Sequence, residues 1–251
     1  KEKKYKGTRS VNNKNIPKRT IVFYLDNISA KTAKEMLSRK EEFPNISKII
    51  NNEKYINFNN NLSISNWTLP AAISMLTGLN FEEHRLFHPK IKFFQIINQA
   101  IINSPGLVGF NEIDNLRKFR CGTNWRLQSE HGLNSLYEHC ISSPVFSDCY
   151  TTLSQSIKQL DIASYDESLH WIDLMDSHHP VLGSVLPYKS DAIKPITLTK
   201  GMIYDDKQNN FENSSKNIYL SQLASIDNII GQILSYSYRK VNPEDHLIIF
   251  L

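Results

Sequence analysis

Residues with the chemistry of metal ligands, anion contacts and nucleophiles stand in three short clusters of this sequence. Asp26 and Asn27 directly follow one apolar run, and Asp176 to Pro180 (DSHHP) follow another. Ca²⁺ and Mg²⁺ bind carboxylate and amide oxygens, so the Asp-Asn pair is a candidate metal site. An Asp-Asn pair after a strand also forms turns or helix caps, so a turn is the alternative for these two residues.

The third cluster is Thr68, which stands two residues before Pro70 in the stretch NWTLPAAISMLTGL. Pro is well tolerated in the first turn of a helix, and Thr68 or Asn66 is then in place to cap that helix. A hydroxyl at the positive end of a helix also lies next to any bound anion, and a metal ion lowers its pKa toward an alkoxide nucleophile. The local sequence therefore leaves both a helix cap and a catalytic nucleophile open for Thr68.

Apolar strands and helices that alternate along the chain must position these clusters. Such alternation predicts an α/β fold, in which ligands bind at the carboxyl ends of the strands. His178 and His179 then lie after a strand, either in a solvated loop or as a pair of oxyanion contacts. Periodicity and capping residues predict strands at 20–25, 55–58, 106–110, 169–174 and 245–251, and helices at 30–40 (capped by Ser29), from the turn before Pro70 to Gly78, at 151–163 and at 218–239. Residues 90–102 suit a helix or a strand pair, 43–64 suit loops around their short strand, 184–215 suit a long surface excursion, and 111–150 give no clear pattern.

Composition and charge exclude several classes of protein. The 251 residues are 40% hydrophobic, as in an average globular domain, and contain no apolar run long enough to cross a bilayer. Residues 1–19 hold eight Lys or Arg and one Glu, so the overall charge of +4 leaves −3 for the remainder, which argues against nucleic-acid binding. Residues 1–19 are therefore predicted to be a basic linker or tail, with a phosphate-binding arm as the alternative. Three cysteines, Cys121, Cys140 and Cys149, lack metal-site spacing.

The order of the motifs resembles the sulfatase family of the alkaline-phosphatase superfamily. In sequence order they are IVFYLDN, FPNISKII, YINFNNNLSISNWTLP with AAISMLTGL, HWIDLMDSHHP, YLSQLASIDNIIGQIL and the strand LIIF. The resemblance covers about residues 20–110 and 169–251. It implies a three-layer α/β/α sandwich with a mixed, mainly parallel sheet, and a catalytic domain that starts at residue 20.

The resemblance also implies roles for individual residues. Asp26 matches the metal ligand on the first strand of the family, and Asn27 stands where many sulfatases have a second Asp. Thr68 falls on the nucleophile position, which also contacts the metal. His178 matches the histidine that contacts the anionic group of the substrate, and His179 and His84 are further candidates. The implied cofactor is a divalent metal ion: Ca²⁺, Mg²⁺, Mn²⁺ or Zn²⁺.

Departures from the family pattern change the expected chemistry. Sulfatases carry Cys or Ser in C/S-x-P-S-R, which is converted to formylglycine, whereas this chain has Thr68 followed by Leu-Pro-Ala-Ala. Threonine cannot become that aldehyde, and Ala72 replaces the arginine. A sulfo-threonine would have to be attacked at sulfur, but a phospho-threonine is released by in-line attack of water or an acceptor alcohol.

The expected function is therefore a metal-dependent hydrolase or transferase that acts on sulfate or phosphate esters through Thr68. Its substrate would be a small anionic ester, or one linked to a glycan or lipid. The alternative is a non-catalytic relative that binds an anionic glycan or polymer, or has a structural role. Because the sequence given ends within an apolar strand at Leu251, we expect the polypeptide to continue, with the rest of the metal site and the general acid beyond it. Residues 1–251 alone are expected to be inactive.

Overall fold

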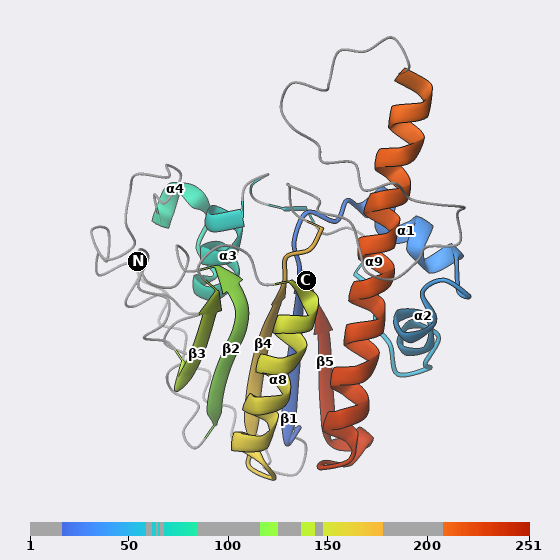
Figure 1. Ribbon diagram of the computed structural model, residues 1–251. Coiled ribbons are helices and arrows are strands. Elements are labelled where there is room, and N and C mark those ends of the chain that lie inside the picture. The colour runs from blue at the N-terminus through green and yellow to red at the C-terminus, as the bar shows by residue number, and fades with distance from the viewer. Residues whose placement is uncertain are drawn as a thin grey trace.

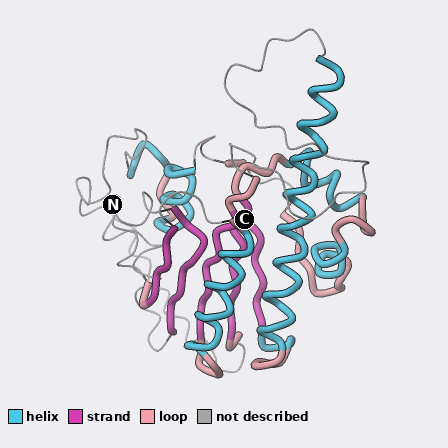
Figure 2. Tube along the Cα trace, viewed as in Figure 1, coloured by secondary structure: helices cyan, strands magenta, loops and turns pink. Residues whose placement is uncertain are grey.

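The computed structural model describes residues 17–58, 62–63, 65, 68–84, 116–124, 137–143, 148–177 and 208–251; for 68–69, 81, 123–124, 142–143 and 208–218 it describes the backbone only. Figure 1 and Figure 2 show strands side by side, with two helices packed in front of them and shorter helices at the right and at the upper left. The elements are β1 (Arg19–Leu25), α1 (Ala30–Ser38), α2 (Pro44–Ile50), α3 (Thr68–Thr77), α4 (Phe81–His84), β2 (Arg117–Asn124), β3 (His139–Ser143), α8 (Cys149–Ala163), β4 (Ser168–Leu174), α9 (Gln208–Tyr238), a 3₁₀ turn (Pro243–Asp245) and β5 (His246–Phe250).

The five described strands form one sheet in the order β3-β2-β4-β1-β5. Every neighbouring pair is parallel, and the register places Leu25 at the end of β1 opposite Leu174 at the end of β4. Parallel strands present their carboxyl ends at one edge of the sheet. The α/β architecture predicted from the sequence is therefore confirmed.

Helices α8 and α9 cover one face of the sheet (Figure 1). α8 leads from β3 to β4 and α9 leads from β4 to β5, and both connections cross the sheet in the same direction, which is the right-handed sense. Apolar side chains of the central strands and of both helices are fully buried between them. They include Ile21, Phe23, Ile172, Leu160, Leu223, Ile226, Ile230 and Ile233.

The connections that leave β1 and β4 run to opposite sides of the sheet. In the described part of the chain, the next strand after β1 is β2, on the far side of β4, whereas the next strand after β4 is β5, on the far side of β1. Two adjacent strands with opposite exits form a topological switch point, where open α/β sheets place their ligand crevice. The ends of β1 and β4 are therefore the part of this edge where a site is expected.

A buried ion pair lies on the face of the sheet opposite α8 and α9. Nε and Nη2 of Arg120 donate to the two carboxylate oxygens of Asp173 at 2.9 and 3.0 Å, and both side chains are 1% exposed. Trp171 Nε1 donates to the same carboxylate at 3.1 Å. Burial by itself lowers the pKa of Arg120, but the charge of Asp173 more than offsets it, so this pKa lies above its ordinary value. The pair therefore joins β2 to β4 through two buried hydrogen bonds.

Arg19, the last residue of the predicted basic tail, is instead the first residue of β1 and is fully buried. Its guanidinium donates to Ser168 Oγ at 3.3 Å, Ser237 Oγ at 3.2 Å and the Ser164 carbonyl at 2.5 Å. These oxygens belong to β4, to α9 and to the turn after α8. Arg19 therefore ties the amino-terminal ends of β1 and β4 to the ends of both helices.

Several predicted elements match the structure and others do not. The strands expected at 20–25, 169–174 and 245–251 and the helices at 30–40 and 151–163 are present within one or two residues of their bounds. The strand expected at 55–58 is wrong, because these residues form no strand, and 44–50 form helix α2 rather than a loop. β2 and β3 occupy part of the unassigned stretch, and α9 begins at Gln208, inside the expected surface excursion. Residues 90–102 and 106–110 lie outside the described part of the chain.

The Arg120–Asp173 pair generates a prediction about stability. The substitution Arg120→Met leaves a buried carboxylate without its counter-ion, which lowers the free energy of unfolding by about 3–5 kcal/mol. Arg117→Met, on the same strand, removes partly exposed pairs with Glu138 and Asp166 and an exposed hydrogen bond to the Ile162 carbonyl, and should cost about 1 kcal/mol. Urea unfolding of both variants measures the difference, and equal losses would contradict the prediction.

His170 generates a prediction about pH. Its imidazole stacks on Phe119 with centroids 4.8 Å apart, and burial followed by the charge of Arg19 sets its pKa well below 6.5. Below pH 6.5 the His170 imidazole binds a proton in the unfolded chain but not in the folded chain. The free energy of unfolding therefore decreases as the pH is lowered, by up to about 1.4 kcal/mol per pH unit. His170→Phe should flatten the dependence of unfolding free energy on pH between 6.5 and 5. The idea fails if wild type and variant have the same slope in urea unfolding.

Candidate functional site

The first candidate cluster lies at the carboxyl end of β1. Asp26 is 6% exposed, and its backbone N–H donates to the Leu174 carbonyl at 3.4 Å, at the end of β4. Asn27 follows with φ 59°, in the left-handed region that Asn tolerates better than most residues. The chain therefore turns sharply directly after Asp26, and this carboxylate is held at the edge of the sheet.

Hydrogen bonds join this turn to the turn after β4. Asn27 Nδ2 donates to the Ser177 carbonyl at 2.9 Å, and Ser177 Oγ donates to the Asp26 carbonyl. Tyr219 Oη, on α9, donates to the Asn27 carbonyl at 2.8 Å. The structure thus brings Asp26 and Asn27 together with the start of the DSHHP cluster, at the switch point of the sheet.

Asp176, the first residue of that cluster, connects β4 to α8. Its Oδ1 accepts the backbone N–H of Cys149 at 3.0 Å, in the first turn of α8, where helix N–H groups lack intrahelical partners. Its Oδ2 is buried and has no hydrogen-bond partner in the described part of the chain. Burial is the main cause that raises the pKa of this carboxyl. The arrangement fixes the turn directly after β4, which His178 follows in the sequence.

The cysteines do not supply a nucleophile to this edge. All three are free, and burial raises the pKa of Cys149 strongly and that of Cys121 and Cys140 to about 12. A thiol attacks as its thiolate, so a buried thiol with a raised pKa is inert. Cys149 begins α8 after the N-cap Asp148, and its buried thiol interacts with the Asp176 carboxyl group.

Thr68 is the first residue of α3, so its backbone lies at the helix end where N–H groups lack intrahelical partners. Its side chain, together with Asn66, His178 and His179, lies outside the described part of the chain. The nucleophile and the substrate contacts predicted from the sequence therefore stay predictions.

His84 has a structural role in the described fold. Its side chain is buried, Nε2 is 2.9 Å from Ser74 Oγ, and the imidazole hydrogen-bonds to the backbone of Pro70. Burial is the main cause that lowers its pKa, so the ring is neutral at pH 7. His84 thus ties the end of α4 back to α3, as expected of a satisfied core histidine.

Two of the motifs quoted from the sequence form one packing contact. Asp227, on α9, accepts the backbone N–H of Asn45 at 3.2 Å and that of Ile46 at 2.7 Å, at the start of α2. Asn45 Nδ2 also donates to Asp227, at 3.0 Å. A Cβ on Gly231 would lie 2.2 Å from Asn45 Oδ1, so the two helices approach closely at this glycine. The Pro-Asn and Asp-x-x-x-Gly motifs therefore hold α2 against α9.

The described residues at the sheet edge fit part of a metal site. The buried carboxylate of Asp26 and the side-chain carbonyl of Asn27 are hard oxygen donors, which suit Ca²⁺, Mg²⁺ or Mn²⁺. Nowhere in the described ranges do three or more His, Cys, Asp or Glu residues form a group that could hold a metal ion. A metal site at this edge would need further ligands from residues outside those ranges.

Sequence reasoning missed Ser177 and Tyr219 as residues that shape this edge. Both residues lie within sequence motifs named above, Ser177 in DSHHP and Tyr219 in YLSQLASIDNIIGQIL. Only the fold shows that both donate hydrogen bonds to the turn after β1.

No protein-family model matches this sequence, and no curated protein matches it at a significant level. Among the helices of the described part of the chain, none has both the length and the apolar character to span a membrane.

The turn at Asn27 generates a prediction. Asn27→Ala removes the hydrogen bond to Ser177. It also places alanine, which is disfavoured at positive φ, in the left-handed turn, and the two effects together should lower the free energy of unfolding by about 2–3 kcal/mol. Asn27→Gly loses the same bond without the steric cost and should lose only about 1 kcal/mol. Thermal and urea unfolding compare the two, and a glycine variant as unstable as the alanine variant would refute the role of the left-handed turn.

Proposed function

We propose that this chain is a sulfatase-like domain that catalyses metal-dependent hydrolysis or transfer of phosphate or sulfate esters at the carboxyl edge of its sheet. The observation that carries the proposal is the bonded pair of turns after β1 and β4. This pair holds the buried Asp26 beside the cluster that leads to His178, at the switch point where α/β folds bind ligands.

The proposal assigns a role to each candidate residue. Asp26, with Asn27, holds the divalent cation, and Thr68 at the start of α3 supplies the nucleophile. His178, with His179, contacts the anionic group of the ester. A bound divalent cation would supply positive charge that stabilises the transferring group.

Phosphoryl transfer is the reaction that these residues suit best. The Thr68 oxygen forms a bond to phosphorus while the bond from phosphorus to the leaving alkoxide breaks. Thr68 loses its hydroxyl proton, and the leaving oxygen takes up one proton. Attack on phosphorus by water or an acceptor alcohol then releases Thr68. Sulfate esters are the less favoured substrate class, because a sulfo-threonine lacks the carbon–oxygen cleavage that the aldehyde hydrate of formylglycine allows.

The three-layer arrangement of alkaline-phosphatase type belongs to the same proposal. The chain crosses from β1 to β2 and from β2 to β3 in the direction opposite to the later connections. The right-handed rule would then bring part of these connections to the face opposite α8 and α9 as a third layer, while α2 itself packs against α9.

A non-catalytic domain that binds anionic ligands is the second candidate. It is favoured by Asn27, whose left-handed backbone and bond to Ser177 suit a turn residue. Asn27 also lacks the charge that a second aspartate would give a metal site.

Thr68 provides the test of catalysis. In the full-length protein, with Mg²⁺, Mn²⁺, Ca²⁺ or Zn²⁺ added in turn, chromogenic phosphate esters should be hydrolysed faster than sulfate esters. Thr68→Ala should lose about 1,000-fold or more in kcat, whereas Thr68→Ser keeps a hydroxyl and measurable turnover. Asp26→Asn should lower metal content, measured by elemental analysis. Turnover that survives Thr68→Ala would refute the assignment of Thr68 as the nucleophile. If the wild-type protein shows neither bound metal nor turnover, the result would favour the non-catalytic binding domain.

A further inference from the structure

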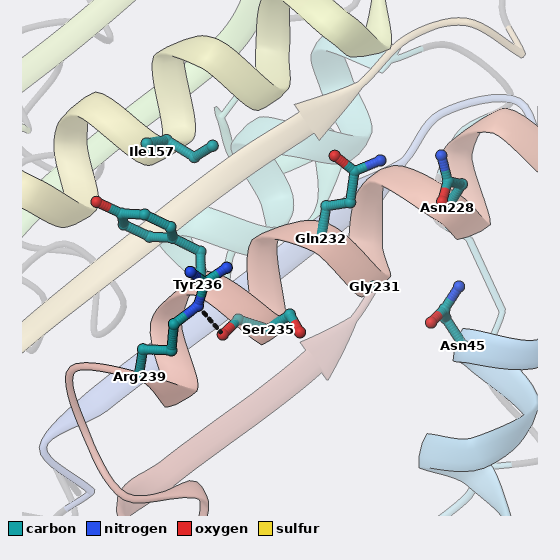
Figure 3. Close-up of a pocket in the computed structure, with 8 residues that line it drawn as sticks. All are labelled: Asn45, Ile157, Asn228, Gly231, Gln232, Ser235, Tyr236 and Arg239. Atoms are coloured by element: carbon teal, nitrogen blue, oxygen red, sulfur yellow. Dashed lines mark hydrogen bonds between the residues drawn. The ribbon is translucent and has the colours of Figure 1, made fainter.

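A pocket of about 380 Å³ lies on the outer side of α9, away from the sheet edge described above (Figure 3). Its residues come from the C-terminal half of α9 and the residue after it, with one residue each from α8 and α2. They are Asn45, Ile157, Asn228, Gly231, Gln232, Ser235, Tyr236 and Arg239. No acidic side chain is among them, and the volume is within the range of small-ligand sites.

Gly231 makes room for the pocket and fixes one wall of it. Because Gly231 has no side chain, no group projects from α9 at this position. The side chain of Asn45, on α2, lies directly against Gly231. Asn45 cannot swing into the pocket freely, because its Nδ2 donates to Asp227 at 3.0 Å. The position of this wall is therefore set by the contact between α2 and α9.

The ring of Tyr236 forms another wall of the pocket, and its neighbours fix its position. Its hydroxyl donates to Asp161 at 2.6 Å, and the Arg239 guanidinium and the Lys240 ammonium lie 5.6 and 5.4 Å from the ring centroid. Ile157, on α8, lies on the same side of the pocket as the Tyr236 ring (Figure 3). An isoleucine and a tyrosine ring together give the pocket a small apolar surface.

The polar groups of the pocket suit a hydroxylated anion. In the described part of the chain, the amides of Asn228 and Gln232 have no hydrogen-bond partner, so both retain donors and acceptors for ligand hydroxyls. Asp161 is paired with Lys240 at 2.6 Å, and no described carboxylate pairs with Arg239, whose Nε donates to the Ser235 carbonyl at 3.4 Å. Arg239 therefore remains as the positive charge of the pocket.

We infer that this pocket is a binding site for a hydroxylated monocarboxylate of pyranose size, such as a uronic acid. The apolar wall of Ile157 and Tyr236 packs against the ring of the sugar. The amides of Asn228 and Gln232 bind its hydroxyls, and the Arg239 guanidinium binds its carboxylate, for which a planar fork of donors is well matched. The site is separate from the proposed catalytic edge and does not depend on it.

The test measures binding of D-glucuronate and of D-glucose to the full-length protein by NMR titration or calorimetry, at constant ionic strength. Glucuronate should bind saturably with Kd of about 1 mM, and glucose at least about tenfold more weakly. Arg239→Gln should weaken glucuronate binding to the level of glucose. Lys158→Gln is the matched control, since it removes one positive charge from an exposed residue next to Ile157 that does not line the pocket, and it should leave binding unchanged.

A second variant separates the pocket from its charge. Ser235→Trp fills the pocket at an exposed helix position and should abolish binding of both sugars while urea unfolding stays near that of wild type. The inference is overturned if glucuronate does not saturate or if glucose binds as tightly. It is also overturned if Lys158→Gln weakens binding as much as Arg239→Gln. None of these variants touches Asp26 or Thr68, so each result stands apart from the test of catalysis.

Discussion

The parallel pairing of β1 with β4 is the constraint on which the other features of this structure depend. The two strands are far apart in sequence, and seven consecutive residue pairs from Arg19↔Ser168 to Leu25↔Leu174 fix their register. Both ends of the pair are held by side chains: Arg19 bonds Ser168 at one end, and Asn27 bonds Ser177 at the other. A shift of one residue would turn every side chain to the other face, so this register decides what lies at the site.

Buried charge divides between the two faces of the sheet. On the face toward α8 and α9, Arg19 is satisfied by hydroxyl and carbonyl oxygens, next to a histidine, His170, that burial keeps neutral. On the other face, Arg120 and Asp173 neutralise each other with two hydrogen bonds. Since an isolated charge is costly away from water, both arginines require neighbours in fixed positions. They therefore restrict how the strands and helices can pack.

Residues with the chemistry of a site divide into two groups once the fold is known. His84 and Asp227 have polar partners within the fold and hold helices together, and Cys149 is a buried thiol in the first turn of α8. Asp26 instead lies at the switch point, where the chain exits in opposite directions. Asp176, bonded to the first turn of α8, sits at the base of the loop that follows β4. The proposed chemistry rests on this second group, because position at the carboxyl edge distinguishes it from polar residues of the same type elsewhere.

The sequence by itself determined the α/β class and most of the elements, because apolar runs such as 20–25 and 169–174 and the cap at Ser29 are local signals. It did not determine β2, whose residues Arg117 to Asn124 are largely polar. That strand is stabilised by the distant Asp173, which local periodicity cannot reveal. The strand expected at 55–58 failed for the converse reason, since β-propensity without a partner strand gives no strand. Strand order, and hence the meeting of Asp26 with Ser177, was decided only by tertiary structure, because it depends on contacts between residues about 150 positions apart.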